Sequence, residues 1–298
     1  MQHSNRTYYT LDEAIHELYG PACHITERRF VSGGDINEAS ALILDDGNRL
    51  FMKSNLLRSY DNFSSEADGL AAMRETGTVR VPEVLGIGTD PEGISFLLLE
   101  YIESEKTSRR YWEELGRSLA EMHRAPSAGS PAFGWKKNNY IGAGHQVNTW
   151  HDSWISFFRD CRLAPQFRDA DRYFDAGDRQ RADFLMSHLD SFLIEPDKPS
   201  LVHGDLWAGN VMAGKGGTAW LIDPAVYYGH PEVDLAMSEL FGEFAPDFYG
   251  AYREVYPPEP GYRERRDLYN LYQLLNHLNM FGASYLSSVR QILRRYAG

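Results

Sequence analysis

Apolar residues in the amino-terminal part of the chain fall in short runs separated by turn residues, a pattern typical of β-strands. These runs predict strands over residues 39–44, 50–53, 84–88 and 95–101. Asp46-Gly47 lies between the first two runs and predicts a hairpin, because these residue types accept the positive φ of a tight turn. In the same region, apolar residues three and four positions apart predict helices over 11–19 and 63–75.

From residue 103 onward the spacing of apolar residues becomes mostly helical. A long helix is predicted over 268–285, preceded by three apolar stripes: Trp112, Leu115, Leu119 and Met122, then Trp154, Phe157, Phe158 and Cys161, then Phe184, Leu185, Leu189 and Phe192. Short strand pieces over 211–212 and 219–222 interrupt these helices. We therefore predict an α+β fold with two lobes, a small β-rich lobe over 1–102 and a larger, mainly helical lobe over 103–298.

Composition and charge narrow the partners of such a protein. The 298 residues are 43% apolar, which is enough for a packed core, and their formal net charge is −12. This excess of negative charge argues against nucleic acid and anionic membranes as partners, because both attract cationic surfaces. The two cysteines form no disulfide framework, and neither a signal peptide nor a membrane-spanning run is visible. We expect a cytoplasmic protein and predict no particular oligomeric state.

The strongest chemical signal lies in the segment from Leu201 to Asp223. Its first apolar residues lead to His203-Gly204-Asp205, Asn210 follows Asp205 by five positions, and Asp223 ends the next apolar strand. A kinase-type phosphoryl transferase needs a carboxylate that takes the proton of the attacking hydroxyl, and an amide oxygen and a second carboxylate that hold Mg²⁺. Each acid alone is more simply a solvated loop carboxylate or a helix cap. The three at this spacing predict Asp205 as the base and Asn210 with Asp223 as metal ligands.

Two departures from protein kinases indicate the class of substrate. Gly204 follows His203 where most protein kinases have an arginine, and Pro224 rather than Phe-Gly follows Asp223. An arginine at that position couples the catalytic loop to a phosphorylated activation loop, so its absence argues against this form of regulation. Both departures favour a small-molecule substrate. We interpret His203 as a structural hydrogen-bonding residue, because kinases assign the role of base to the aspartate.

The first lobe supplies a candidate lysine for the nucleotide phosphates. Lys53 ends an apolar strand, where kinases place this lysine, although a solvated strand-end lysine would have the same local sequence. Glu66 follows thirteen residues later on the predicted helix and is the expected ion-pair partner. Asp68 and Glu75 are its competitors, and we prefer Glu66 because it precedes the apolar run of the helix.

Backbone groups of the same lobe complete the predicted nucleotide site. The turn at Gly33 and Gly34 is expected to cover the phosphates with N–H groups, although it lacks the usual three-glycine spacing. The backbone of Glu100 and Ile102, at the boundary between the lobes, is expected to contact adenine. A plain connecting strand would look the same.

With these residues in place, the chain resembles the fructosamine/ketosamine kinases, a branch of the protein-kinase-like superfamily that includes aminoglycoside and choline kinases. The resemblance covers nearly the whole chain. Its most specific piece is His203 to Asn210, in which Trp207 after Asp-Leu is distinctive. Other segments that look like the family are 51–55, 66–70, Asn139-Tyr140-Ile141-Gly142, 146–148, 154–158, 162–166 and 223–237.

The resemblance implies a protein-kinase-like fold and ATP-dependent phosphorylation of the 3-hydroxyl of a ketosamine, the sugar adduct that glycation leaves on an amine. The phosphorylated product is unstable and eliminates, which frees the amine. Ribulosamine, erythrulosamine and fructosamine types, free or protein-bound, are the implied substrates, with ATP and Mg²⁺ as cofactors. In this scheme Asp205 is the base, Asn210 and Asp223 hold Mg²⁺, and Lys53 with Glu66 positions the phosphates.

Three further residues have open roles. Trp207 either stacks on the sugar-amine substrate or packs against the catalytic loop, and His230 is a candidate pocket residue. Asp234 is expected to be a cap and an anchor of the loop rather than a catalytic group. Some family members carry a cysteine in the phosphate-covering turn, but this turn has none, so a disulfide switch is not expected.

Other functions predict other features. An aminoglycoside, choline or homoserine kinase would share the catalytic residues, and segment 135–166 favours ketosamines over these alternatives. A non-catalytic kinase-like module would have lost Lys53, Asp205, Asn210 or Asp223, yet all four are present. An aminoglycoside- or choline-type phosphotransferase therefore remains the principal alternative.

Overall fold

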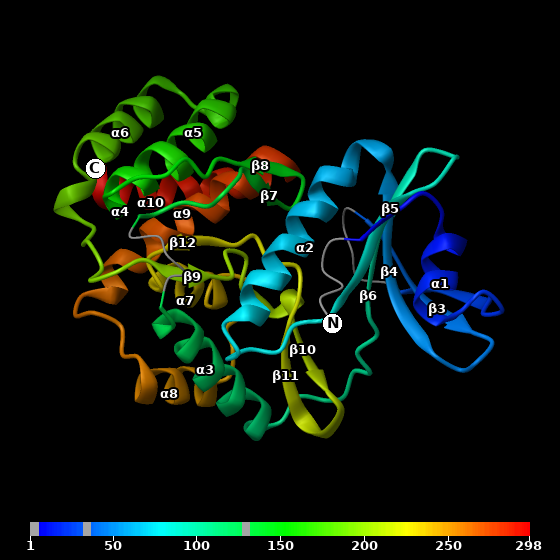
Figure 1. Ribbon diagram of the computed structural model, residues 1–298. Coiled ribbons are helices and arrows are strands. Elements are labelled where there is room, and N and C mark those ends of the chain that lie inside the picture. Colours follow the sequence, from blue (N-terminus) through cyan, green and yellow to red (C-terminus); the bar gives the residue numbers. More distant parts are fainter. Residues whose placement is uncertain (1–5, 32–36, 127–131) are drawn as a thin grey trace.

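The computed structural model describes residues 6–31, 37–126 and 132–298. A six-stranded sheet forms one side of the molecule, and most of the helices form the other (Figure 1). The predicted division into a β-rich and a helical part is therefore visible in the arrangement of the chain. Within the described residues, no helix combines the length and apolarity that a bilayer-spanning segment requires.

The sheet contains all the strands predicted in the first lobe. Its strands run in the order β1-β5-β6-β4-β3-β2, and every neighbouring pair is antiparallel except β1 with β5. Their bounds are β1 Thr7–Tyr8, β2 Ile25–Val31, β3 Glu38–Leu44, β4 Arg49–Leu56, β5 Val84–Thr89 and β6 Ile94–Glu100. The hairpin between β3 and β4 turns at Gly47, whose φ of 87° confirms the predicted tight turn.

Two helices flank this sheet. Helix α1 (Leu11–Tyr19) is capped by Thr10, whose side chain accepts the N–H of Glu13 at 3.0 Å. The helix covers one face of the sheet with Ala14 and Ile15. Helix α2 (Tyr60–Glu75) lies between the sheet and the helical lobe and contacts both β5 and β7 (Figure 1). Because α2 bridges the two parts, a side chain on it can reach the space between them.

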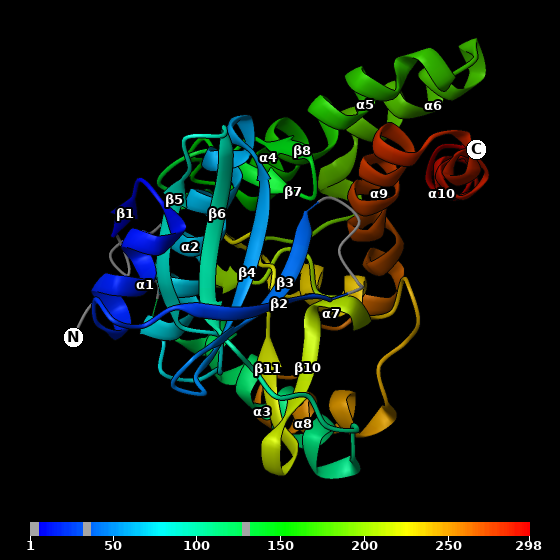
Figure 2. The same cartoon turned by 90° about the vertical axis from the view of Figure 1, so that its right-hand side faces the viewer.

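The second lobe is built from helices and three small hairpins or strand pairs. The helices are α3 Arg109–Arg124, α4 Trp154–Phe157, α5 Ala164–Ala170, α6 Ala176–Ser187, α7 Glu232–Ser238, α8 Pro246–Val255, α9 Tyr262–Phe281 and α10 Leu286–Ala297. The strands are β7 Asn139–Ile141, β8 Gly144–Gln146, β9 Ser200–Val202, β10 Val211–Gly214, β11 Thr218–Leu221 and β12 Tyr227–Gly229, paired as β7-β8, β9-β12 and β10-β11. Figure 2 shows α5, α6 and α10 together at the end of the molecule away from β1.

The apolar stripes pack this lobe as expected. Leu115, Leu119 and Met122 of α3 are buried, as are all four residues of the stripe that begins at Trp154. Helix α3 crosses α8 so closely that a Cβ at Gly116 would lie 2.3 Å from the carbonyl oxygen of Phe248. The glycine therefore permits the close contact between α3 and α8.

Two of the predicted helical segments were wrong in extent. The predicted 268–285 helix begins at Tyr262 and stops at Phe281, because Gly282 adopts a φ of 92° and its N–H closes the last turn on Leu278. Helix α10 then follows and was not predicted. The third stripe is also interrupted, since α6 ends at Ser187 and Phe184 is exposed.

Candidate active site

Residues from both lobes line a single cleft of about 1060 Å³. Lys53 comes from β4 and Glu66 from α2, whereas Asp205, Asn210 and Asp223 come from the loop after β9 and the end of β11. The first two residues and the last three belong to segments far apart in sequence, and the fold brings them to the same cavity. The cleft is large enough for a nucleotide and a second small molecule.

His203 connects the loop that carries Asp205 to the strand that carries Asp223. Its Nε2–H donates to the carbonyl oxygen of Ile222 at 2.9 Å, and its Nδ1 accepts the main-chain N–H of Asp205 at 3.2 Å. The side chain is fully buried, and burial lowers its pKa although Asp234 opposes the shift. Both ring nitrogens are thus used in structural hydrogen bonds, as predicted for this residue.

Asp234 anchors the start of the same loop. Its two carboxylate oxygens accept the main-chain N–H groups of His203 at 2.7 Å and Gly204 at 2.9 Å. His123 of α3 contacts one of these oxygens through Nε2 at 3.0 Å, and its Nδ1 lies 2.8 Å from the hydroxyl of Tyr252. The predicted role of Asp234 as a loop anchor is confirmed.

Gly204 has a backbone reason to be glycine. Its φ is 83°, and a Cβ there would lie 2.2 Å from the carbonyl oxygen of Ala225. The N–H of Ala225 in turn donates to the carbonyl oxygen of His203 at 2.8 Å, so the two chain segments are held in contact. An arginine at this position would collide with the segment that follows Asp223.

Asp205 and Asn210 interact directly. The amide Nδ2 of Asn210 donates to the main-chain oxygen of Asp205 at 2.8 Å and to its carboxylate at 3.0 Å. Burial raises the pKa of Asp205 to about 7, and the carboxylates of Asp223 and Asp234 add to the increase while the Asn210 bond opposes it. A carboxyl group whose pKa lies near neutrality is suited to accept a proton and release it again.

Lys53 pairs with two carboxylates. Its Nζ lies 2.8 Å from Glu66, as predicted, and also contacts Asp223 across the cleft. Burial alone would lower the pKa of Lys53, but these two carboxylates outweigh it and the pKa is raised. The competing Asp68 binds Lys137 at 2.7 Å instead, and Glu75 is exposed. The lysine is therefore a fixed positive charge at the wall of the cleft.

Asp223 and Asn210 lie on neighbouring backbone segments. The N–H of Ile222 donates to the carbonyl oxygen of Asn210 at 3.0 Å, which brings the two side chains to one part of the cleft. Asp223 has a φ of 55°, a conformation that costs free energy in a residue other than glycine and directs its carboxylate. Its side chain is 42% exposed, and carboxylate and amide oxygens are the ligands that Mg²⁺ prefers. The donor set therefore fits this metal.

The remaining predicted residues divide into three groups. Glu100, Ile102 and Trp207 line the cleft. Gly33 and Gly34 lie outside the described residues. The prediction of His230 as a pocket residue is wrong: its side chain is 1% exposed and packs between Trp154 and Tyr269, away from the cleft.

Several residues of the cleft were not assigned to it from the sequence. The β7–β8 hairpin contributes its first strand and turn, Asn139 to Gly142, and α9 contributes Asn276, His277, Met280 and Phe281. The hairpin had been singled out only through its resemblance to a family segment. The sequence of α9 was interpreted only through its apolar pattern, and such a pattern does not show which polar residues of a helix face a cavity.

Buried amides fix the base of this hairpin. Asn139 donates to the carbonyl oxygen of Val226 at 2.8 Å, and Gln146 donates to that of Ala225 at 3.1 Å. Asn148 donates to Asn139 at 2.7 Å and accepts from the fully buried guanidinium of Arg162 at 2.8 Å. The hairpin is thereby joined to the segment that follows Asp223, so these two walls of the cleft are held in a fixed relation to one another.

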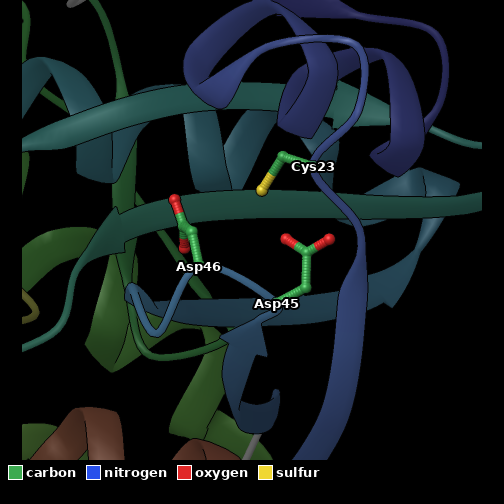
Figure 3. Close-up of side chains that lie close together, drawn as sticks. All are labelled: Cys23, Asp45 and Asp46. Carbon is green, nitrogen blue, oxygen red and sulfur yellow. The ribbon is translucent and has the colours of Figure 1, made fainter.

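A separate cluster in the first lobe brings Cys23 close to Asp45 and Asp46 (Figure 3). Burial and a hydrogen bond to Asp45 raise the pKa of Cys23 to about 11, so the thiol stays protonated at neutral pH. A protonated thiol is a poor metal ligand and a poor nucleophile. We therefore assign this cluster a structural role at the start of β2.

Comparison with known proteins adds an independent line of information. The model of the fructosamine kinase family matches residues 8–297. A probable ketoamine kinase of Synechocystis is 41% identical over 97% of this chain and 96% of its own length. A chloroplastic protein-ribulosamine 3-kinase of Arabidopsis thaliana is 43% identical over 93% of this chain and 84% of its own. The crystal structure of a putative fructosamine-3-kinase from Haemophilus somnus superposes with a TM-score of 0.84 at 30% identity and covers 97% of both chains.

Proposed function

The chain belongs to the fructosamine kinase family, and we propose on this premise that it transfers the γ-phosphoryl group of ATP to the 3-hydroxyl of ketosamines. The observation that carries the proposal is the meeting of Lys53, Asp205 and Asp223 in one cleft of a chain that matches the family from residue 8 to residue 297. The phosphorylated ketosamine then eliminates and frees the amine, so the activity reverses glycation.

Asp205 is the proposed general base. In the transfer, the bond between the γ-phosphorus and the bridging oxygen of ATP breaks, ADP leaves, and a new bond forms to the sugar oxygen. The proton of the 3-hydroxyl passes to the Asp205 carboxylate. The raised pKa of this group supports the role, since a base of pKa about 7 holds the proton more readily than an ordinary aspartate.

Lys53 and Glu66 are the proposed contacts for the nucleotide phosphates, and the backbone of Glu100 and Ile102 is the proposed contact for adenine. The ion pair of Lys53 with Glu66 at 2.8 Å holds the ammonium group toward the cleft. We propose that residues 1–102 form the nucleotide-binding lobe and residues 103–298 the catalytic and substrate lobe. Trp207 lines the cleft beside Asp205 and is the proposed stacking surface for the sugar.

Asn210 and Asp223 are the proposed ligands of Mg²⁺. When bound, the metal would neutralise charge on the phosphates of the nucleotide. The support for this assignment is their oxygen donor set and the closeness of their backbones, given above.

The substrate is proposed to be a free or protein-bound ketosamine of the ribulosamine or fructosamine type, and the location to be cytoplasmic. The buried state of both free cysteines is consistent with a reducing compartment. The aminoglycoside- or choline-type alternative has the weaker support, because the relatives reported above are ketoamine and ribulosamine kinases.

An ATP-consumption assay of the purified chain with Mg²⁺ tests the proposal. Ribulosamine and fructosamine adducts of a simple amine are the substrates, an aminoglycoside and choline are the comparison compounds, and Asp205→Asn is the inactive control. Turnover on a ketosamine is expected. Turnover on an aminoglycoside or choline alone would leave a kinase but overturn the ketosamine assignment.

A further inference from the structure

A second cavity of about 340 Å³ lies next to the cleft and shares part of its wall. Asn276 and Met280 of α9 line both cavities. The β7–β8 hairpin also serves both, since Asn139 to Gly142 face the cleft and Ala143 to His145 face the second cavity. One turn of the hairpin and one face of α9 therefore border both spaces.

The wall between the cavities carries an unsatisfied hydrogen-bond donor. Asn276 is 1% exposed, its Oδ1 accepts from Gln166 at 3.5 Å, and its Nδ2 has no partner among the described residues. On the next turn of α9, Asn279 donates to Gln166 at 2.7 Å, while its Oδ1 likewise has no partner in the described part of the chain. Buried amide groups without a partner cost free energy unless a water molecule or a ligand satisfies them, so this wall offers a donor and an acceptor to a polar group.

The outer rim of the second cavity is cationic. Arg168 of α5 and Arg172 just after it line the cavity together with Asp169. Arg168 approaches Asp169 only to 3.8 Å, and no carboxylate lies within 4 Å of the Arg172 guanidinium among the residues that the structure describes. Two guanidinium groups against one carboxylate leave the rim positive, although the chain as a whole has a net charge of −12. The local field thus favours an anionic group.

We propose that this second cavity, lined by Gly144, His145, Arg168, Arg172, Asn276 and Asn279 and named here the amine-side pocket, binds the amine half of ketosamines whose amine carries a carboxylate. The inference rests on the proposed function. With the sugar hydroxyl at Asp205, the amine substituent leaves the cleft past Asn276 and enters the pocket. Its carboxylate then meets Arg172 and Arg168, whose guanidinium groups bind carboxylates through paired N–H donors.

The size and chemistry of the pocket favour an amino acid over a bulkier amine. A volume of about 340 Å³ is near the lower end of the range for small-molecule sites, and it suits a ketosamine whose amine half is a short amino acid. The unpartnered amide groups add a donor and an acceptor deeper in the wall. The pocket therefore selects glycated amino acids, or glycated residues with a carboxylate nearby, over neutral glycated amines.

A matched series of ribulosamines tests this selection. The substrates are the ribulosamines of glycine, β-alanine, 4-aminobutyrate and 6-aminohexanoate, each paired with the ribulosamine of the corresponding carboxamide. The ratio of kcat/KM between acid and amide is expected to reach about tenfold at one chain length, because a charge-assisted hydrogen bond is worth roughly a factor of ten or more. The higher kcat/KM of the acid should result mainly from a lower KM, and the acid-to-amide ratio should decline with added salt.

Variants of the rim locate the effect. Arg172→Gln is expected to bring the acid-to-amide ratio close to one, whereas Asp169→Asn is expected to raise it by removing the opposing charge. Arg159→Gln is the matched control, since Arg159 is a half-buried arginine outside both cavities that binds Asp160 at 2.8 Å. This control should retain the ratio of the unaltered protein.

Two results would overturn the inference, and they are distinct. Turnover of every ribulosamine with a flat acid-to-amide ratio at all lengths, unchanged in Arg172→Gln, would refute the amine-side pocket and leave the proposed function intact. Turnover of no ketosamine, with the chain folded, would refute the proposed function and the pocket with it.

Discussion

The carboxylate of Asp234 lies beneath His203 and accepts its main-chain N–H at 2.7 Å. The second carboxylate oxygen accepts the N–H of Gly204, and Asp234 is itself fully buried. Buried main-chain N–H groups cannot donate to water and need an acceptor within the protein. The Asp234 side chain supplies this acceptor for the first two residues of the loop that carries Asp205.

Replacing Asp234 with alanine is expected to lower both stability and kcat. Two buried N–H groups would lose their acceptor, at a cost of about 1–3 kcal/mol each. Urea unfolding followed by fluorescence, together with steady-state kinetics, measures the two effects. Asp197→Asn, at an exposed position of a connecting loop, is the control. A stability within about 0.5 kcal/mol of the unaltered chain would contradict the role of Asp234 as an anchor.

Asp205→Asn is expected to reduce kcat by about 10²- to 10⁴-fold with little change in the KM for ATP, because the proposed base is removed and the phosphate contacts remain. Asparagine can still accept the hydrogen bond that Asn210 donates to this side chain. Steady-state kinetics at saturating ketosamine provides the measurement. If kcat stayed near its original value, another group would have to be the base.

The same substitution is expected to stabilise the protein at high pH. Burial raises the pKa of Asp205 to about 7, whereas an aspartate in an unfolded chain titrates at about 4. Between these values the folded chain holds a proton that the unfolded chain has lost, so stability falls as pH rises from about 4 to 7. Asparagine carries no charge and avoids this loss.

Thermal unfolding of Asp205→Asn and of the unaltered chain at pH 4 to 8 measures this effect. The Tm of the variant should exceed that of the unaltered chain at pH 8, by about 2–4 °C for each kcal/mol regained, and the difference should shrink toward pH 4. A Tm difference that did not depend on pH would show that the pKa of Asp205 is not raised.

Gly204→Ala is expected to be destabilising and to lower kcat. The new Cβ would lie 2.2 Å from the oxygen of Ala225 in a backbone conformation of positive φ, which alone costs about 1–3 kcal/mol. Gly250→Ala is the matched control, because a Cβ at that position of α8 meets nothing within 4 Å. Helix propensity predicts a gain of about 0.5–1 kcal/mol for the control. Equal effects of both substitutions on denaturant unfolding would refute the backbone argument.

Local patterns were sufficient for most of the fold. Strands β3 to β6 and helices α1 and α2 follow from apolar spacing and turn residues, which act over a few positions, whereas the two-residue strand β1 was not predicted. The long terminal helix was misjudged because its apolar pattern continues across Gly282, and only the backbone conformation there shows the break. Short strands such as β7, β8 and β12 have too few residues to produce a periodic pattern.

The chemistry of the site was also predictable in part. Spacing singled out Asp205, Asn210 and Asp223, and the structure places all three in one cleft. Asp234, expected to be a cap and an anchor, proved to anchor the loop through the main-chain N–H groups of His203 and Gly204. The prediction that His230 lines the pocket was wrong because nearness in sequence to Asp223 does not determine where a side chain points. In the structure the His230 ring packs against Trp154. Asn276 and Met280 were missed because they reach the cleft only through the packing of α9, a contact between segments distant in sequence.

The buried amides at the base of the β7–β8 hairpin hold that base in place and leave the turn free to vary in sequence. Its turn, Gly142 and Ala143, is exposed, whereas Asn139 and Gln146 behind it are tied to the segment after Asp223. Insertions or substitutions in the turn can therefore reshape this part of the cleft while the segment that follows Asp223 keeps its position. Directed evolution toward new acceptors should therefore start from a library randomised at Gly142 and Ala143. Asn139 and Gln146 at the base of the hairpin should be kept unchanged in that library.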